Sequence, residues 1–189
     1  MSYFLSFSGS QSKFSRAGYL LWNIGSLLER RQINFGAIHA VDLPQELSSD
    51  TRLIDQFVDE TVAQIQFAKA ILLVVPYVKE ESLGLLQSLL SRLPTDTFRG
   101  KPIVLFVTGG AAGHVALIEQ ALQSSLLRLG VSAVAARVHL SSSDWIIIGN
   151  ERPRLSRITE REIADALDLV IRGISTRKPA NYSLAEYTA

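Results

Sequence analysis

The stretch AILLVV, Ala70–Val75, decides the fold because it is apolar at every position. A run of this length suits a strand, and a strand without polar alternation lies in a sheet that is covered on both faces. Four further runs have a strand-like character: YFLSFS (Tyr3–Ser8), NFGAIHAV (Asn34–Val41), PIVLFV (Pro102–Val107) and VSAVAARVHL (Val131–Leu140). The sequence therefore predicts five strands.

Segments with apolar residues at helical spacing alternate with these strands. They are Arg16–Arg31, Arg52–Phe67, Leu83–Leu93, Gly113–Leu129 and Thr159–Ile174. Strand–helix alternation of this kind is typical of a parallel sheet with helices on both faces. We expect an α/β, flavodoxin-like three-layer sandwich whose five-stranded parallel sheet has the order 2-1-3-4-5. We expect one domain over residues 1–175, followed by a polar tail over residues 176–189.

Composition excludes several classes of function. Nineteen Lys and Arg residues against eighteen Asp and Glu residues give a net charge of +1, which offers no electrostatic basis for binding nucleic acid or an anionic membrane. The chain has no cysteine, so disulfides, thiolate catalysis, cysteine-ligated zinc and iron–sulfur clusters are excluded. The three histidines have no metal-ligand spacing, and the N-terminus lacks the pattern of a signal peptide. We expect a cytoplasmic protein without a metal site.

Ligands of such folds bind at the carboxyl ends of the strands, so the loops after the first, third and fourth strands are the candidate site. The first loop lies in SFSGSQSKFSRAG, Ser6–Gly18, and leads into a helix that Ser15 is expected to cap. Free backbone N–H groups and the helix dipole favour an anion there, and Lys13 and Arg16 add positive charge. The sequence is consistent with a phosphate site, and the alternative is an ordinary serine-capped turn.

The other two loops are PYVKEESLG, Pro76–Gly84, and TGGAAGH, Thr108–His114. Tyr77 is suited to packing beside a planar ligand, and Gly109 and Gly110 allow backbone N–H groups to approach a ring edge or an oxyanion. The alternatives are a surface loop and a tight turn into a helix. Since the three loops offer no obvious acid, base or nucleophile, we expect a cofactor to carry the chemistry.

Two motifs in register on this frame, G-S-x(4)-S-R at Gly9–Arg16 and T-G-G-x-x-x-H at Thr108–His114, resemble the NADPH-dependent FMN reductase family. The likeness runs from about Phe4 to Val170 and is strongest to the sulfonate-assimilation branch, the small reductases of two-component flavin monooxygenase systems. In that branch an extra residue often bulges the helix after the T-G-G loop, at a position that falls near Gln120 here.

The resemblance implies binding of FMN, hydride transfer from NADPH or NADH to flavin N5, and delivery of reduced FMN to a partner flavin-dependent monooxygenase. The loop after the first strand would hold the FMN phosphate, and the loops after the third and fourth strands would flank the isoalloxazine. The cofactor-binding residues that it implies are Ser8, Ser10, Ser15, Arg16, Ala17, Pro76, Tyr77, Val78, Lys79, Thr108, Gly109 and Gly110.

Leucine-rich helices and a mean hydropathy of +0.19 indicate self-association as a homodimer or homotetramer. One helix also carries Ala116, Leu117 and Ala121 outside its main apolar stripe. For the predicted helix Leu83–Leu93, the alternative is that its leucines simply belong to a leucine-rich core. Its leucines are Leu83, Leu85, Leu86, Leu89, Leu90 and Leu93.

Two other functions stay open. One is a flavodoxin-like binding protein without turnover, which is favoured by the acidic pair Glu80–Glu81 in the loop Pro76–Gly84. The other is a quinone or azo-dye reductase of the same fold that retains its FMN.

Overall fold

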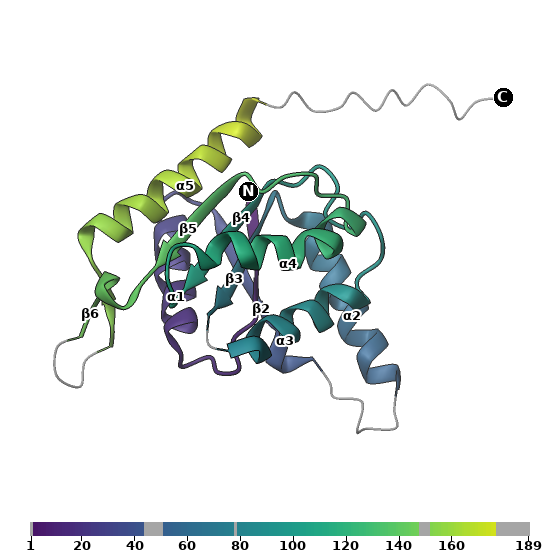
Figure 1. The fold of residues 1–189 in the computed structure, drawn as a ribbon. Coiled ribbons are helices and arrows are strands. Elements are labelled where there is room, and N and C mark those ends of the chain that lie inside the picture. Colours follow the sequence, from purple (N-terminus) through teal and green to yellow (C-terminus); the bar gives the residue numbers. More distant parts are fainter. Residues whose placement is uncertain (1, 44–50, 78, 148–151, 177–189) are drawn as a thin grey trace.

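The computed structural model describes residues 2–43, 51–77, 79–147 and 152–176, and its centre is a five-stranded parallel sheet (Figure 1). The strand order is β2-β1-β3-β4-β5, which confirms the predicted order 2-1-3-4-5. Each neighbouring pair is parallel. The strands are β1 (Tyr3–Ser8), β2 (Asn34–His39), β3 (Ala70–Pro76), β4 (Ile103–Thr108) and β5 (Ala136–Leu140).

Helices cover both faces of the sheet, as the three-layer prediction requires. Two of them, α1 (Arg16–Glu29) and α5 (Arg157–Thr176), share one apolar cluster with the strands. The other three, α2 (Thr51–Phe67), α3 (Lys79–Arg92) and α4 (His114–Arg128), contribute to the cluster on the opposite face. In Figure 1, α3 and α4 lie in front of the sheet and α1 lies behind it.

The central strand β3 and its neighbour β4 are buried along their whole length, as their unbroken apolar runs predicted. Alternate side chains serve the two clusters: Leu72 and Phe106 pack with α1 and α5, whereas Leu73 and Leu105 pack on the other side. Removing apolar surface from water on both faces is the main stabilising contribution to such a core. The sheet is therefore a rigid base for the loops at its carboxyl edge.

The prediction of a strand from Val131 is wrong, because β5 begins only at Ala136. The residues before it end α4. Gly130 has a φ of +86° and donates its N–H to the Leu127 carbonyl, and the Val131 N–H donates to the Leu126 carbonyl. These two hydrogen bonds form a Schellman motif, which uses Val131 as part of the helix cap.

Two helices begin two or more residues earlier than predicted. α3 starts at Lys79 instead of Leu83, since the Lys-Glu-Glu sequence there consists of good helix formers. α5 starts at Arg157 instead of Thr159, because the Thr159 N–H donates to the Ser156 hydroxyl and Ser156 thereby caps the helix. The segment Pro76–Gly84 is thus mostly helix and only briefly a loop.

A short antiparallel hairpin, β6 (Trp145–Ile146) with β7 (Arg154–Leu155), follows β5 and was not predicted. Two-residue strands are too short to show a period of two in the sequence. Trp145 and Leu155 are buried and join the cluster beneath α1 and α5. The hairpin therefore extends the core at the β5 edge of the sheet.

The leucine stripe of α3 belongs to the chain's own core. Leu86, Leu89, Leu90 and Leu93 are fully buried, so the leucine-rich core explains them and they cannot form an interface. α4 is an uninterrupted α-helix, so no π-bulge occurs at Gln120.

None of the helices within the described ranges is long and apolar enough to cross a bilayer. The predicted tail lies outside the described residues except for Thr176, which ends α5. The proposed domain boundary at residue 175 stays a prediction.

Candidate functional site at the carboxyl edge of the sheet

Three loops meet at the carboxyl edge of the sheet and are joined by backbone hydrogen bonds. The Gly9 N–H after β1 donates to the Val74 carbonyl of β3 at 3.0 Å. The Tyr77 N–H after β3 donates to the Thr108 carbonyl of β4 at 2.7 Å, and the Gly109 N–H donates to Leu140 of β5 at 2.6 Å. The parallel register thus brings together the loops that sequence reasoning singled out.

Serine hydroxyls build the loop after β1. The Ser10 and Ser15 hydroxyls hydrogen-bond each other at 2.7 Å, and the Ser10 hydroxyl also contacts the Ser12 carbonyl at 2.9 Å. The Ser10 N–H donates to the Ser8 hydroxyl, and both Ser8 and Ser10 are buried. Two of the predicted phosphate ligands therefore shape the loop from inside, and their side chains do not face solvent.

The loop delivers the chain to the N-terminus of α1, where Ser15 is the N-cap, as expected. Its hydroxyl accepts a hydrogen bond from the Gly18 N–H at 3.3 Å. The N–H groups of Arg16 and Ala17, in the first turn, have no intrahelical acceptor, and the helix dipole is positive there. Ala17 is buried in the core, so only its backbone could serve an anion. This donor set fits a phosphate group such as that of FMN.

Two cations flank the first turn in different surroundings. Lys13 Nζ lies 2.7 Å from Asp42 Oδ2, so a neighbouring carboxylate already compensates its charge. Arg16 Nη1 donates to the Ser142 hydroxyl at 3.0 Å, which is a neutral partner, and no carboxylate among the described residues pairs with its guanidinium. Arg16 is therefore the better placed of the two to attract a phosphate.

His39 ends β2 close to Lys13 and Asp42. Its buried Nδ1 has no hydrogen-bond partner in the described structure. Burial lowers the pKa of His39, the Lys13 ammonium lowers it further, and the Asp42 carboxylate acts in the opposite direction. A neutral His39 thus adds no positive charge next to the loop.

Gly18 is a residue that sequence reasoning missed. A Cβ at this position would lie only 1.8 Å from the Lys13 carbonyl oxygen, so the loop packs directly on the bare backbone of α1. The available signal was a glycine in the first turn of a helix, where alanine would be favoured by about 1 kcal/mol. The close approach of the Lys13 carbonyl explains why glycine stands there.

Tyr77 and the Thr108–Gly110 turn form the second part of the site. The Tyr77 side chain is 40% exposed and stacks on the His114 ring, with centroids 3.9 Å apart and planes 7° from parallel. Gly109 and Gly110 have φ values of +86° and +68°, which favour glycine. An exposed aromatic face beside a glycine turn suits a flat ring such as isoalloxazine.

The remaining predicted residues contribute less to what the structure describes. Pro76 is the buried end of β3, and Thr108 is the buried end of β4. Lys79 begins α3. Val78 lies outside the described residues.

The loop after β5 was not predicted to belong to the site, yet Arg16 reaches it. Its short helix η2 (Ser142–Asp144) is held by Asp144, whose carboxylate accepts hydrogen bonds from the Ser141 N–H and hydroxyl and from the Thr159 hydroxyl. Burial raises the pKa of Asp144, but these hydrogen bonds outweigh burial and leave the pKa below its ordinary value. The loop is therefore a fixed anchor for the Arg16 side chain.

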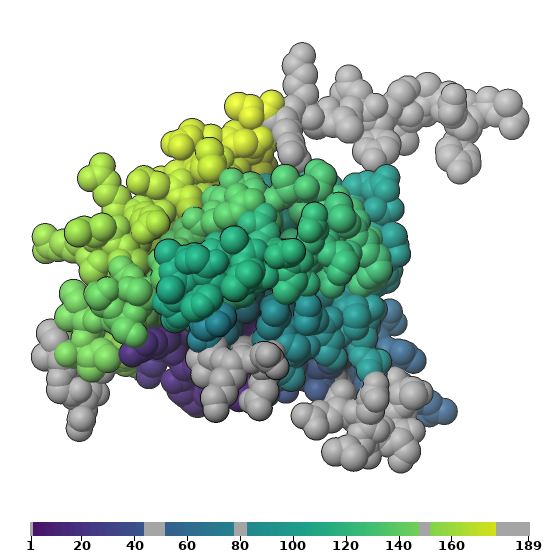
Figure 2. Space-filling view, in the orientation of Figure 1, coloured from purple at the N-terminus to yellow at the C-terminus, as the bar shows by residue number. Residues whose placement is uncertain are grey.

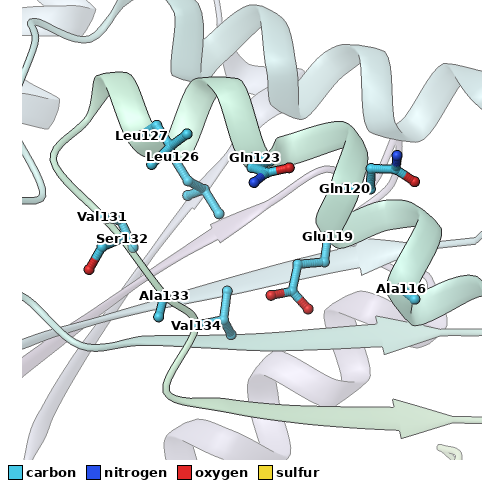
Figure 3. A pocket seen from close by; sticks show the side chains of 10 residues that line it. All are labelled: Ala116, Glu119, Gln120, Gln123, Leu126, Leu127, Val131, Ser132, Ala133 and Val134. Carbon is cyan, nitrogen blue, oxygen red and sulfur yellow. The ribbon is translucent and has the colours of Figure 1, made fainter.

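A groove of about 290 Å³ lies elsewhere, between α4 and the segment that leads into β5 (Figure 3). Glu119, Gln120 and Gln123 line it from α4, and Val131–Val134 line it from the other side. None of the predicted cofactor-binding residues lines this groove. Among the residues that the structure describes, no group of three or more His, Cys, Asp or Glu side chains could hold a metal ion.

The chain is similar in sequence and in fold to several known proteins. An FMN reductase (NADPH) of Pseudomonas putida is 24% identical over 165 residues, which cover 87% of this chain and 84% of the relative. The apo crystal structure of an NADH:FMN oxidoreductase shares the fold, with a TM-score of 0.73 and 22% identity over 94% of this chain and 92% of that chain. The NAD(P)H:(acceptor) oxidoreductase FerB of Paracoccus denitrificans gives a TM-score of 0.62 and 20% identity over 93% and 98% of the two chains. Since the family model for NADPH-dependent FMN reductases matches residues 3–145, the chain belongs to the NADPH-dependent FMN reductase family.

Proposed function

We propose that the chain reduces FMN with NADPH or NADH at the carboxyl edge of the sheet, with the phosphate on the loop after β1 and the ring beside Tyr77 and the Thr108–Gly110 turn. The observation that carries this assignment is the N-terminus of α1. It combines a serine cap, two first-turn N–H groups without intrahelical acceptors and the Arg16 guanidinium. The family to which the chain belongs supports FMN as the flavin.

The chemistry that FMN supplies when bound is acceptance of a hydride from the nicotinamide at N5, with a proton from solvent completing the reduced flavin. The chain's own residues bind and orient. Arg16 and the first turn of α1 would hold the phosphate, and Tyr77 would pack against the ring. In the turn after β4 the Gly109 N–H is already bonded to the Leu140 carbonyl, so the Gly110 N–H is the group that could serve the ring edge. In the described structure the His114 and His139 rings bond to backbone groups, in keeping with a reaction that needs no general base.

Membership of the sulfonate-assimilation branch and delivery of reduced FMN to a partner monooxygenase are part of this proposal. The motifs at Gly9–Arg16 and Thr108–His114 support them. A reductase that serves a partner must release its flavin, so we expect FMN to be lost on gel filtration. A cytoplasmic location belongs to the same proposal.

We further propose that the protein is a homo-oligomer that uses the outer face of α4. Leu117 and Leu127 on this face are 58% and 55% exposed, and Ala116, Gln120 and Ser124 are also exposed. In Figure 2 the green surface of α4 lies across the middle of the face turned towards the viewer. Exposed leucines among small and amide side chains suit packing against a second helix. Sedimentation of the wild-type chain and of Leu117→Glu tests this, and a monomeric wild type would refute it.

The experiment that tests the function measures oxidation of NADPH by its absorbance, with added FMN, riboflavin or a quinone. We expect saturable oxidation that depends on added flavin, with FMN bound more tightly than riboflavin because only FMN carries a phosphate. Oxidation that needs a quinone, by a protein that keeps its FMN through gel filtration, would favour the quinone reductase. No flavin affinity at all would favour the binding protein without turnover.

A pair of arginine variants tests the phosphate site. Arg16→Ala removes charge-assisted hydrogen bonds, each of which contributes about 1.5–3 kcal/mol, so the Kd for FMN rises about 10- to 100-fold. The Kd for riboflavin stays within about twofold, on the same reasoning. Arg172→Ala removes the same charge from an exposed position near the far end of α5 and leaves both constants unchanged. If Arg16→Ala raised the Kd values for FMN and riboflavin equally, the assignment of the FMN phosphate to this loop would be refuted.

A further inference from the structure

His114 is joined to both loops of the ring site. Its ring stacks on Tyr77, which follows β3, with centroids 3.9 Å apart. Its Nδ1 accepts a hydrogen bond from the Ala111 N–H at 2.8 Å, in the turn that follows β4. Because Nδ1 is the acceptor, the neutral ring carries its proton on Nε2. One side chain therefore links two loops that are far apart in the sequence.

Gly110 makes this arrangement tight. A Cβ at Gly110 would lie 2.5 Å from His114 Nδ1 and 2.5 Å from Tyr77 Cδ1, so its backbone packs directly against the stacked pair. The start of the turn is held separately, since the Gly109 N–H donates to Leu140 and the His139 ring lies 3.1 Å from the Gly109 carbonyl. The half-exposed Tyr77 ring is thus held by the stack with His114 on its face and by the Gly110 backbone beside it.

We propose that His114 is a positioning residue for the flavin ring: it holds the Tyr77 ring and the Gly110–Ala111 turn in one arrangement before the flavin arrives. The inference rests on the proposed function, because it needs a flat ligand at this edge of the sheet. Without His114 the Tyr77 side chain gains rotamer freedom and the Ala111 N–H loses its acceptor. Both changes must be reversed when the ring binds, so they weaken binding.

Three variants separate the two contacts of His114. His114→Phe keeps a flat ring for the stack and removes the acceptor, whereas His114→Asn keeps an acceptor near Nδ1 and removes the ring. His114→Ala removes both. Ala112→Ser changes an exposed position in the same turn and is the control.

The measurements are the Kd for FMN from flavin fluorescence, kcat at saturating FMN, and the NMR shifts of the Tyr77 ring protons and the Ala111 amide in the flavin-free chain. We expect His114→Ala to raise the Kd about tenfold, which corresponds to about 1.4 kcal/mol. The Phe and Asn variants fall between it and the wild type. We expect kcat to change less than about threefold, because the substitution weakens binding of the flavin ring more than it disturbs the position of the ring once it is bound. Stacking on the His114 ring should shift the Tyr77 ring protons upfield. We expect this shift to persist in the Phe variant and to be lost in the Ala and Asn variants.

Several outcomes would overturn the inference. Wild-type FMN affinity in His114→Ala would refute it while leaving the proposed function intact. Tighter binding in that variant would also refute it, since the stacked pair would then occupy the place of the ring. A wild-type chain without FMN affinity would overturn the proposed function together with the inference. The flavin-free NMR spectra tell a missing stack from a missing ligand.

Discussion

Replacing Gly18 by alanine tests whether the loop after β1 is built on the bare backbone of α1. The added Cβ would lie 1.8 Å from the Lys13 carbonyl oxygen. Carbon and oxygen atoms in contact are separated by about 3.3 Å, so the loop must move by about 1.5 Å. The loop cannot move without displacing the Ser12–Ser15 segment that caps the helix.

Two opposing terms set the effect of Gly18→Ala on stability. Overpacking costs about 1–3 kcal/mol, whereas alanine in a helix gains about 1 kcal/mol over glycine. The free energy of unfolding therefore falls by about 0–2 kcal/mol, as a difference of these values. Flavin binding suffers more, because a displaced cap loses one or more phosphate hydrogen bonds, and we expect the Kd for FMN to rise at least about tenfold.

The assay is titration of FMN by fluorescence, with urea unfolding of the same samples. Gly173→Ala is the matched control, since Gly173 is also helical and a Cβ there meets nothing within 4 Å. This control should unfold at higher urea and bind FMN like the wild type. Suppose that the Kd of Gly18→Ala for FMN is within twofold of the wild-type value and that the variant gains stability as Gly173→Ala does. The packing of Lys13 on Gly18 then does not determine the conformation of the loop that holds the phosphate.

Three further predictions concern stability. Ser6→Ala removes a buried hydroxyl that has no hydrogen-bond partner among the described residues, and it should raise the free energy of unfolding, measured in urea, by about 1 kcal/mol. A loss of stability would show that the hydroxyl is hydrogen-bonded in solution. Asp168 accepts two hydrogen bonds from the Arg31 guanidinium, which hold its pKa below the ordinary 3.8. The folded state thus binds fewer protons, so this stabilisation is present above the pKa of Asp168 in the unfolded chain and disappears as the pH falls below that pKa. Asp168→Asn should therefore flatten the acid limb of the stability–pH curve. Because the pair is partly exposed, the variant should lose less than about 1 kcal/mol at pH 7. Asp144→Ala leaves the Thr159 hydroxyl without this acceptor, and thermal unfolding should show a loss of about 1–3 kcal/mol.

Most of the sheet could be predicted from the sequence because its strands are buried on both faces. The unbroken apolar runs of β3 and β4 and the helical spacing between the strands indicate a parallel sheet, and the order of its strands is as expected. The errors fall where local hydrogen bonds compete with pattern. Val131 is apolar like a strand residue but caps α4, and the hairpin of Trp145 and Leu155 is too short to have a period.

For the candidate site, the sequence was enough to predict which loops lie at the carboxyl edge of the sheet. Ser15 as the cap and Arg16 beside it follow from residue type and spacing alone. The sequence could not show that Ser8 and Ser10 turn inward, because their burial depends on the Ser10–Ser15 hydrogen bond and on packing beneath α1.

The sequence by itself determined the alternation of strands and helices, and hence the edge of the sheet at which a ligand is expected, because both follow from periodicity and from the geometry of parallel sheets. Only the tertiary structure decided which side chains meet at that edge. The stack of Tyr77 on His114, the approach of Lys13 to Gly18 and the reach of Arg16 to Ser142 each depend on distances across the fold. Such contacts leave no periodic trace in the chain, since they are set by how neighbouring loops pack.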